Sequence, residues 1–195
     1  MTKIIVLDCD GVLIDYMKHF GEIYHKIFNR KLNILNPKAY YPENYYSLSW
    51  DNDKQKEHFF EQFNVQGWRD MQDLPGAVKA TQKLKKIGYK IIVLTSIPNE
   101  AEDKRHKNLL DLDMPIDATI ACGYNSGVNH KKPYIEAINP EYFVDDLLTN
   151  FKGIESNSRH IFIDHKNPDI TLEKTEKIKI HKSFSSLEEF VDKLI

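Results

Sequence analysis

The sequence predicts an α/β fold with a Rossmann-like, doubly wound, mostly parallel sheet and a small helical cap inserted after the first strand. Residues 4–7 and 90–94 form two apolar runs rich in β-branched side chains, which is typical of strands buried in a parallel sheet. A helical pattern precedes the second run, and strand and helix patterns alternate after it. Residues 16–73 do not follow this alternation, so we expect them to form the insertion.

The helix before the second strand is the best-defined helical element of the expected core. It opens after Pro75 and Gly76 and ends at Gly88, because a glycine suits the left-handed backbone common at helix ends. Its expected apolar face consists of Ala77, Ala80, Leu84 and Ile87.

Shorter elements complete the expected sheet. We predict strands at 116–121, 142–144 and 161–163, an edge strand at 178–180, and a short helix at 133–138. Ser185 and Glu188 form a capping-box pattern. It precedes apolar residues at helical spacing, namely Leu187, Phe190, Val191 and Leu194. A C-terminal helix is therefore expected.

The insertion is expected to contain two helices joined by an aromatic loop. The first helix is marked by Met17, Phe20, Tyr24 and Ile27, and the second by Phe59, Phe60 and Phe63. The loop carries Tyr40, Tyr41, Tyr45, Tyr46 and Trp50. These rings suit stacking on a substrate base, and they equally suit a miniature hydrophobic core. We expect residues 1–15 and 74–195 to form the core domain and residues 16–73 the cap.

Composition narrows the class of protein. The chain has 195 residues, 41% of them hydrophobic, and a net charge of −2, which favours neither a membrane nor polymeric nucleic acid as a partner. Its two cysteines, Cys9 and Cys122, predict reduced, packed thiols rather than a disulfide framework or a zinc site. The longest apolar runs are too short for a signal segment or membrane span, so we expect a cytoplasmic protein.

Asp8 and Asp10 directly follow the first strand, in the run Asp-Cys-Asp-Gly-Val. Two carboxylates at the carboxyl end of a parallel strand lie where open α/β sheets bind ligands, and a hard cation with oxygen ligands would offset their charge. Gly11 would allow a sharp turn there. The same pattern is also typical of a turn with two solvated aspartates.

Three further groups follow later strands. Thr95 and Ser96 end the second strand, where a hydroxyl suits either a phosphate oxygen or a helix cap. Lys131 and Lys132 precede a short helix, where a lysine would bind phosphate or simply be solvated. Asp145 and Asp146 follow another strand. Adjacent carboxylates repel one another unless a cation or lysine compensates, although one of them would also cap a helix.

Taken together and in this order, these motifs resemble the haloacid dehalogenase (HAD) superfamily over essentially the whole chain. The resemblance implies that Asp8 is a nucleophile and Asp10 the general acid and base. It assigns the phosphate-binding hydroxyl to Thr95, with Ser96 beside it, and the acidic metal site to Asp145 and Asp146 together with Asp8 and Asp10. The pairing with Pro133 favours Lys132 as the site lysine, with Lys131 as the alternative.

The resemblance implies a Mg²⁺-dependent phosphatase that acts on a small phosphomonoester through an aspartyl-phosphate. Mg²⁺, Lys132 and Thr95 would offset the phosphoryl charge while Asp8 attacks and Asp10 transfers protons. The metal would be held by Asp8, the backbone carbonyl of Asp10 and Asp146, and Asp145 would either ligate it or orient the lysine. The short insertion resembles that of the 5′-deoxyribonucleotidase branch, which makes a nucleotide the leading substrate, with sugar phosphates as the alternative.

Other activities remain open at this stage. A phosphomutase or phosphotransferase of the same superfamily would retain every motif. A non-catalytic, receiver-like domain also combines acidic residues, a hydroxyl and a lysine, but its phosphate-accepting aspartate follows the third strand rather than the first. A dehalogenase would not need Asp10. A binding-only descendant would be expected to have lost Asp8, Asp10 or the lysine, and all are present.

Overall fold

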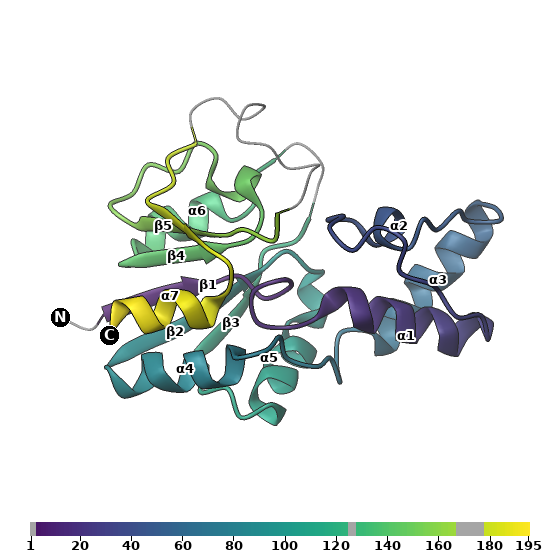
Figure 1. The fold of residues 1–195 in the computed structure, drawn as a ribbon, viewed down its shortest axis with the longest axis horizontal. Helices are drawn as coiled ribbons and strands as arrows, with labels where there is room; N and C mark the ends of the chain where they lie inside the picture. Colours follow the sequence, from purple (N-terminus) through teal and green to yellow (C-terminus); the bar gives the residue numbers. More distant parts are fainter. Residues whose placement is uncertain (1–2, 125–127, 167–177) are drawn as a thin grey trace.

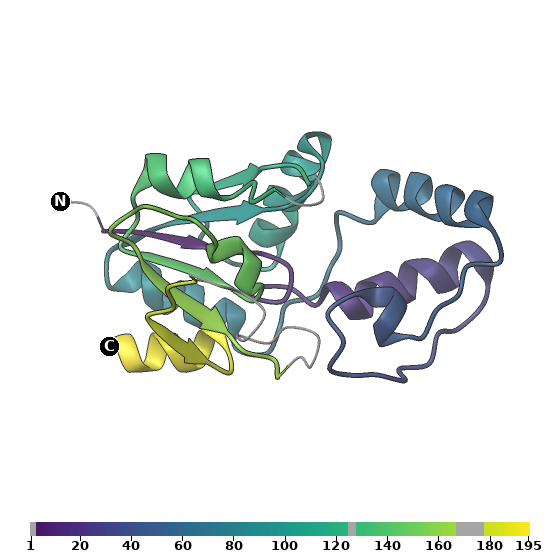
Figure 2. The same cartoon turned by 90° about the horizontal axis from the view of Figure 1, so that it is seen from above.

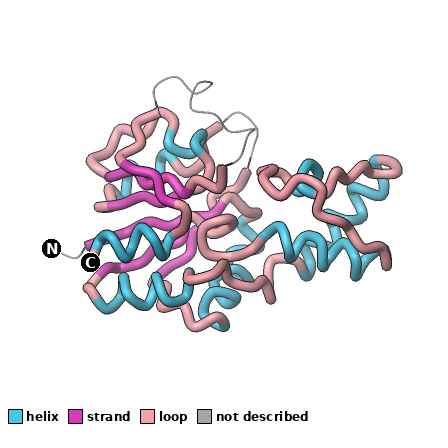
Figure 3. The backbone as a smooth tube through the Cα atoms, in the orientation of Figure 1, coloured by secondary structure: helices cyan, strands magenta, loops and turns pink. Residues whose placement is uncertain are grey.

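The core of the protein is a six-stranded, wholly parallel sheet (Figures 1 and 3). The computed structural model describes residues 3–124, 128–166 and 178–195. The strands are β1 (Lys3–Leu7), β2 (Tyr89–Thr95), β3 (Ala118–Ala121), β4 (Tyr142–Asp145), β5 (Arg159–Ile163) and β6 (Lys182–Phe184). Their order is β3-β2-β1-β4-β5-β6, so the winding direction reverses between β1 and β4. Open α/β sheets bind ligands at the carboxyl ends of the strands beside such a reversal.

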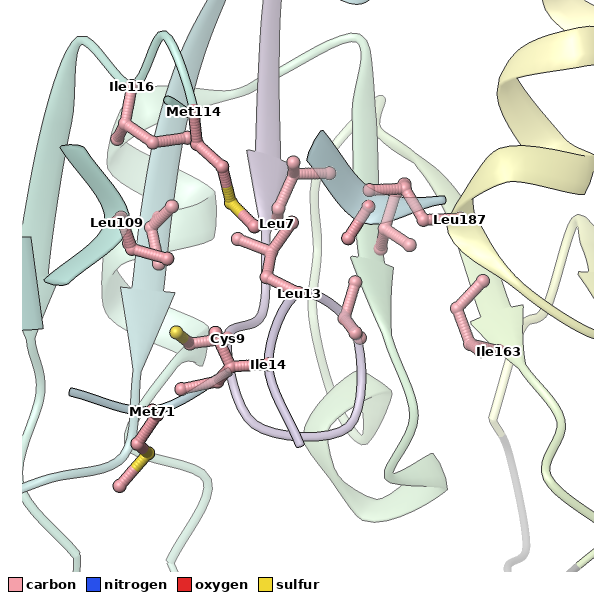
Figure 4. Packing of buried hydrophobic residues seen from close by; sticks show 14 of the residues in the cluster. Leu7, Cys9, Leu13, Ile14, Met71, Leu109, Met114, Ile116, Ile163 and Leu187 are labelled. Atoms are coloured by element: carbon pink, nitrogen blue, oxygen red, sulfur yellow. The ribbon is translucent and has the colours of Figure 1, made fainter. Parts of the chain in front are cut away.

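Helices cover both faces of the sheet, as a doubly wound fold requires. One face packs against α4 (Ala77–Lys86), α5 (Glu102–Asp111) and α7 (Leu187–Leu194), and the other against α6 (Lys132–Ile138) and the short helix η2 (Leu148–Phe151). A single turn, η1 (Asn99–Ala101), precedes α5. Side chains alternate along β1, since Ile5 and Leu7 belong to the first of these layers and Val6 to the second. Figure 4 shows Leu7 and Cys9 packed beside Leu109 and Met114.

Three helices lie between β1 and α4 in the sequence, beyond the carboxyl ends of the strands (Figures 1 and 2). They are α1 (Tyr16–Phe28), α2 (Pro42–Tyr45) and α3 (Asp53–Gln66). Aromatic side chains fill the space between α1 and α3: Phe20, Phe59 and Phe63 are fully buried, and the ring centroids of Phe20 and Phe59 are 4.7 Å apart. Residues 16–73 are hereafter called the insertion; the division into two domains stays a prediction.

Two chain segments connect the insertion to the core, and they pair with each other. The amide of Asp15 donates to the carbonyl of Gln72 at 2.9 Å, and the amide of Leu74 donates to the carbonyl of Leu13 at 2.9 Å. The Asp15 carboxylate also caps α1 by accepting from the amide of Lys18 at 3.0 Å. These hydrogen bonds hold the two connections side by side where the insertion joins the core.

The predicted fold class is confirmed, and three local predictions are wrong. The edge strand is β6 rather than residues 178–180, because Ile178 and Ile180 pack against the α6 face of the sheet while Phe184 pairs with Ile163. The cap of α7 is Ser186, whose hydroxyl accepts from the amide of Glu189 at 3.1 Å, one residue later than the predicted capping box.

The third correction concerns Ile87, which was expected on the buried face of α4. Its side chain is 37% exposed, whereas Ala77, Ala80 and Leu84 are buried as predicted. Ile87 ends the helix and Gly88 follows with a φ of 91°, in the left-handed region expected there. Within the described ranges, no helix combines the length and apolar character needed to cross a bilayer.

Candidate active site

Two neighbouring strands bring acidic residues together at one edge of the sheet. Asp8 follows β1 at the centre, and Asp145 and Asp146 lie at the end of β4, which pairs directly with β1. The amide of Asp8 donates to the carbonyl of Val144 at 2.8 Å, which holds the two strand ends together. One carboxylate oxygen from each of Asp8, Asp145 and Asp146 lies within 4.8 Å of the others, and all three residues are buried. The structure thus brings these three residues of the sequence prediction together.

Lys131 is the lysine that reaches this acidic cluster. Its Nζ lies 2.6 Å from Asp8 Oδ1 and 2.7 Å from Asp145 Oδ2, and its side chain is 1% exposed. The Lys132 side chain is 40% exposed and lies 3.6 Å from Glu136 on the outside of α6. Of the two lysines that the sequence offered for the site, the structure thus places Lys131, and not the favoured Lys132, at the acidic cluster. Lys131 precedes the helix and faces the strand ends, whereas Lys132 is the first helical residue and faces away.

Asn129 fixes the backbone at this point. Its Oδ1 accepts from the amides of Lys131 and Lys132 at 3.1 and 3.2 Å, which is the hydrogen-bonding pattern of a helix cap. Its Nδ2 donates to the carbonyls of Asn150 and Lys152 at 2.8 and 3.0 Å. The start of α6 is thus tied to the segment after β4, so that Lys131 and Asp145 are held by one network.

Asp145 and Asp146 are adjacent but differ in their partners. Asp145 accepts hydrogen bonds from the amide of Leu147 at 2.8 Å and from Asn150 Nδ2 at 2.9 and 3.0 Å, in addition to its contact with Lys131. Asp146 Oδ1 is buried and accepts no hydrogen bond from any described residue. Asp145 therefore orients the lysine, and Asp146 keeps an oxygen available for a ligand.

Burial and mutual repulsion keep these carboxylates poorly stabilised as anions. Burial, opposed by Lys131, raises the pKa of Asp145 to about 6. Burial together with the neighbouring carboxylates of Asp8 and Asp145 raises the pKa of Asp146 well above its usual range, and burial also raises the pKa of Asp8. Burial opposes the charged form of Lys131, but Asp145 and Asp8 outweigh it and raise its pKa. Three carboxylates facing one ammonium leave excess negative charge, which a divalent cation would neutralise.

Gly11 allows Asp146 to approach the loop after β1. Its φ is 81°, and a Cβ atom at this position would lie 2.1 Å from Asp146 Oδ2. Any other residue would therefore push the carboxylate away, besides straining the backbone. The role expected for this glycine as a sharp turn is confirmed, and the close contact with Asp146 is an additional reason for it.

The Asp10 side chain has a partner outside the acidic cluster. Its carboxylate is 28% exposed, and its Oδ1 lies 3.1 Å from Nη2 of Arg105, whose side chain is fully buried. The sequence prediction assigned the backbone carbonyl of Asp10 to the metal and its side chain to acid–base catalysis, and the structure pairs this side chain with an arginine on α5. Arg105 lies in the charged run Lys104-Arg105-His106, which has the composition of a solvated helix, so its burial was not predictable from the local pattern.

The two hydroxyl residues after β2 have different surroundings. Thr95 is fully buried, and its Oγ1 has no hydrogen-bond partner among the described residues. Ser96 lines the adjacent cavity, and its Oγ lies 3.7 Å from Cys122 Sγ. An unpaired buried hydroxyl is unfavourable, so the Thr95 hydroxyl is suited to a ligand oxygen.

A cavity of about 660 Å³ lies between the strand ends and the insertion, and Asp8, Asp146 and Lys131 form part of its lining. From the insertion and its connections, the aromatic lining residues are Tyr16, Phe20, Tyr40, Tyr41, Tyr45, Phe60 and Trp68. His165, from the opposite rim, contacts the carbonyl of Gly11 through Nε2 at 2.7 Å. The cavity is thus acidic and cationic at one end and aromatic at the other.

The aromatic loop of the insertion divides into two groups. Tyr40, Tyr41 and Tyr45 line the cavity, whereas Tyr46 and Trp50 do not. Tyr46 donates to the carbonyl of Met17 at 2.7 Å, and Trp50 packs against Phe59 with ring centroids 5.3 Å apart. Of the two functions expected for these rings, lining a site is open to the first group and building the insertion's core applies to the second.

Solved structures share this fold over almost its whole length. A HAD-superfamily hydrolase of subfamily IA from Geobacter sulfurreducens matches with a TM-score of 0.62 and 17% identity, over 100% of both chains. A magnesium-bound HAD-hydrolase from Bacillus subtilis matches with a TM-score of 0.61 and 15% identity, over 99% of this chain and 98% of the other. L-2-haloacid dehalogenase from Xanthobacter autotrophicus matches with a TM-score of 0.61 and 11% identity, over 100% and 98%.

The fold is thus the one that these HAD-superfamily structures share. The family model for 5′ nucleotidase, deoxy (pyrimidine), cytosolic type C protein (NT5C) matches residues 2–177. The chain therefore belongs to this family of 5′-nucleotidases, which are phosphomonoesterases. No match was found among curated proteins.

Proposed function

We propose that this protein hydrolyses a nucleoside 5′-monophosphate through a covalent phosphoryl intermediate on Asp8. The observation that carries the proposal is the position of Asp8 at the floor of the cavity, 2.6 Å from a buried lysine, with aromatic residues of the insertion at the opposite end. A cavity of about 660 Å³ is of the size that small ligands occupy. The polar end suits the phosphate and the aromatic end suits the base.

The residues present fit a magnesium ion. Asp8 and Asp146 offer oxygen ligands, and the unpartnered Oδ1 of Asp146 is the kind of buried atom that a cation would satisfy. We assign the site to Asp8, Asp146 and the backbone carbonyl of Asp10. Asp145 is better assigned to holding Lys131, because its oxygens already accept hydrogen bonds. Mg²⁺ would supply positive charge that offsets the charge of the phosphoryl group.

The proposed reaction has two displacements. In the first, an Asp8 carboxylate oxygen bonds to phosphorus while the bond from phosphorus to the ester oxygen breaks, and Asp10 gives its proton to the leaving oxygen. In the second, a water oxygen bonds to phosphorus, the bond to Asp8 breaks, and Asp10 takes the proton that the water loses. Lys131 and the Thr95 hydroxyl would stabilise the charge on the equatorial phosphoryl oxygens. Ser96 lines the same end and would contact the phosphate.

Asp10 also separates the proposal from dehalogenation, which the structural likenesses alone do not do. An ester oxygen leaves as an alkoxide and needs a proton, so a second carboxylate is useful, whereas a halide leaves as a stable anion. Asp10 borders the cavity beside Asp8, which is where such a proton donor is required. The side chains around Asp8 therefore favour phosphate ester hydrolysis.

The test combines substrate profiling with detection of the intermediate. Purified protein with Mg²⁺ is assayed for phosphate release from deoxyribonucleoside and ribonucleoside 5′-monophosphates, with sugar phosphates as the comparison. We expect nucleotides to have the highest kcat/KM, and acid quenching during turnover to trap phosphate on Asp8.

The variant Asp8→Asn should form no phosphoenzyme, because an amide cannot attack phosphorus. The matched control is Asp70→Asn, since the Asp70 side chain is 84% exposed and its removal should leave activity unchanged. Near-normal turnover by Asp8→Asn would refute covalent catalysis at this residue. Sugar phosphates as the best substrates would refute the nucleotide assignment. Transfer of the phosphoryl group to an added alcohol or sugar rather than to water would instead indicate a phosphotransferase.

A further inference from the structure

We infer that Arg105 is a positioning residue for the acid–base aspartate, Asp10, and that it ties this carboxylate to the segment by which the insertion returns to the core. The inference rests on the proposed function, since it concerns the proton-transfer steps of that reaction. Arg105 is on α5 and does not line the cavity, and its ion pair among the described residues is with Asp10. Its charge also interacts with that of Asp8, but its direct contact with a reacting group is the one with Asp10.

The first observation is the contact with Asp10. Nη2 of Arg105 lies 3.1 Å from Asp10 Oδ1 and donates to Asp10 Oδ2 at 3.4 Å. One guanidinium nitrogen therefore lies close to both carboxylate oxygens. The Arg105 side chain is fully buried, and arginine remains charged in proteins. A buried cation requires a partner, and Asp10 is the carboxylate that it contacts in the described part of the chain.

The second observation is that the same guanidinium contacts the returning segment of the insertion. Nη1 lies 3.1 Å from Met71 Sδ, and the guanidinium carbon lies 5.5 Å from the centre of the Trp68 ring, a cation–π arrangement. Trp68 in turn lines the cavity and stacks on Tyr16 with ring centroids 6.4 Å apart. Arg105 thus contacts the proton-transferring carboxylate on one side and a wall of the substrate cavity on the other.

A third observation shows that this segment is anchored on α5. Asn108, one helical turn after Arg105, accepts from the amide of Met71 at 3.2 Å and donates to its carbonyl at 3.0 Å. Both backbone groups of Met71 are therefore held by the helix that carries Arg105. Helix α5 therefore contacts both the Asp10 carboxylate, through Arg105, and the returning segment of the insertion, through Asn108.

The consequence is specific to proton transfer. Without the guanidinium, the Asp10 carboxylate would lose its fixed direction, while Asp8, Lys131 and Asp146 would keep their own contacts. Attack on phosphorus would remain, but protonation of a poor leaving group and activation of water would slow down. General acid–base catalysis by one side chain is worth about 10²–10⁴-fold, and a misdirected carboxylate should lose part of that.

The experiment compares Arg105→Met, which keeps an unbranched apolar stem, with Arg105→Lys, which keeps a charge but not the planar fork. We expect kcat for a nucleoside monophosphate to fall about 10²-fold in Arg105→Met with KM changed by less than about threefold, and to recover partly in Arg105→Lys. Arg69→Met is the matched control, because Arg69 is 41% exposed and pairs with Asp111 at 3.3 Å on the surface.

A substrate with a good leaving group distinguishes positioning from general damage. With p-nitrophenyl phosphate, the leaving phenolate needs no proton, but hydrolysis of the phosphoenzyme still needs Asp10 as a base. Arg105→Met should therefore release a rapid burst of p-nitrophenolate approaching one equivalent per enzyme, followed by slow turnover and accumulated phosphoenzyme. A structural defect would instead reduce the burst and the steady rate together.

Stability provides an independent readout of the ion pair. Asp10→Asn would leave the buried Arg105 unpaired and should lower Tm, whereas Asp10→Asn combined with Arg105→Met should recover part of that loss. The inference fails if Arg105→Met matches the wild-type kinetics with both substrates, or if the double variant is no more stable than Asp10→Asn. If the wild-type protein forms no phosphoenzyme, it is the proposed function that fails, and the Tm cycle still tests the ion pair.

Discussion

Two adjacent lysines have different surroundings in this protein. Lys131 is buried and contacts Asp8 and Asp145, while Lys132 is 40% exposed beside Glu136. Successive residues at a helix start point about 100° apart, so only one of a pair can face the strand ends. The sequence pattern located the pair, but which member faces inward depends on how Asn129 fixes the start of α6.

We predict that Lys131→Met lowers kcat/KM for phosphate ester hydrolysis by about 10²-fold or more, because it removes a fixed positive charge from the place where phosphoryl charge develops. Lys132→Met is the control, and its kcat/KM should stay within about threefold of wild type, because a surface pair contributes little. Steady-state kinetics with saturating Mg²⁺ measure both. A larger loss in Lys132→Met than in Lys131→Met would reverse the assignment of the site lysine.

The other site residues differ in how far the sequence could predict them. Asp8, Thr95 and Asp145 were predictable because each directly follows or ends an apolar strand, and the ends of parallel strands share one edge. Arg105 was not, because a charged residue in a charged helix is normally solvated, and its burial depends on the tertiary position of Met71 and Asp10. The local sequence pattern thus predicts site residues at the ends of strands. It does not predict residues such as Arg105, whose burial depends on tertiary packing.

At the scale of elements, the insertion uses its aromatic residues for two separate purposes. Those between α1 and α3 form a core, whereas Tyr40, Tyr41 and Tyr45 face the cavity from the α2 region. Burial, followed by the nearby carboxylate of Asp146, raises the pKa of the Tyr40 phenol well above its usual range, so this hydroxyl stays a proton-bearing donor. The sequence could not separate Tyr46 and Trp50, which pack in the core, from the three cavity tyrosines, because all five rings lie in the same predicted loop.

We predict that replacing the cavity ring that stacks on the base, among Tyr40, Tyr41 and Tyr45, by leucine raises KM for a nucleotide about tenfold. Stacking of one base on an aromatic ring is worth about 1–3 kcal/mol. Hydrolysis of acetyl phosphate, which does not extend to the insertion, should be unchanged in the same variant. The measurement is KM for both substrates in each of the three variants.

Tyr46→Leu is the matched control for these variants, because Tyr46 is buried and bonded to Met17 rather than exposed to the cavity. It should lower Tm through loss of that hydrogen bond and of core packing, and leave nucleotide KM near wild type. The stacking proposal would be contradicted if all three cavity variants kept wild-type KM or if Tyr46→Leu alone raised it.

Element boundaries were the least predictable part of the fold. Two isoleucines at 178 and 180 suggested an edge strand, yet they pack on the α6 face while β6 begins at Lys182. The cap of α7 is likewise Ser186 rather than Ser185. The amide of Ser185 instead donates to the carboxylate of Glu189, not of Glu188, at 2.8 Å. Buried central strands have a strong signal, whereas short edge strands and neighbouring serines depend on what they pack against.

For the molecule as a whole, the acidic cluster links folding stability to both protons and cations. Asp145 has an ordinary pKa of 3.8 and a pKa of about 6 in the folded protein. A raised folded-state pKa means that protonation favours the folded state. The stability that Asp145 contributes is therefore fully present below 3.8 and is lost as pH rises through about 6.

We predict that Mg²⁺ raises Tm by more at about pH 7.5 than at about pH 5, because a cation must displace protons from these carboxylates in acid. With Mg²⁺ at about 100 times its dissociation constant, the gain of about 2.7 kcal/mol corresponds to about 5–10 °C. Thermal unfolding with Mg²⁺ and with chelator, at both pH values, measures the difference.

Asp146→Asn should greatly reduce this Mg²⁺-dependent shift, since it removes the carboxylate whose Oδ1 lacks a partner among the described residues. The control Asp70→Asn should retain it. An equal shift at both pH values, or a full shift in Asp146→Asn, would show that Mg²⁺ stabilises the protein at some other place.

The central position of β1 in the sheet has a consequence for synthesis on the ribosome. Strand β1, which precedes the proposed nucleophile Asp8, is made before its two neighbours, β2 and β4, and the insertion is translated between β1 and β2. Such non-local pairing is slow to form, and an apolar strand without neighbours is prone to aggregation. Until β4 has emerged, Asp8 lacks its acidic partners Asp145 and Asp146, so a nascent chain truncated before Asp145 should be inactive even if β1, β2 and β3 have already paired. Appearance of activity during translation would thus mark completion of the sheet's centre rather than the folding of any single segment.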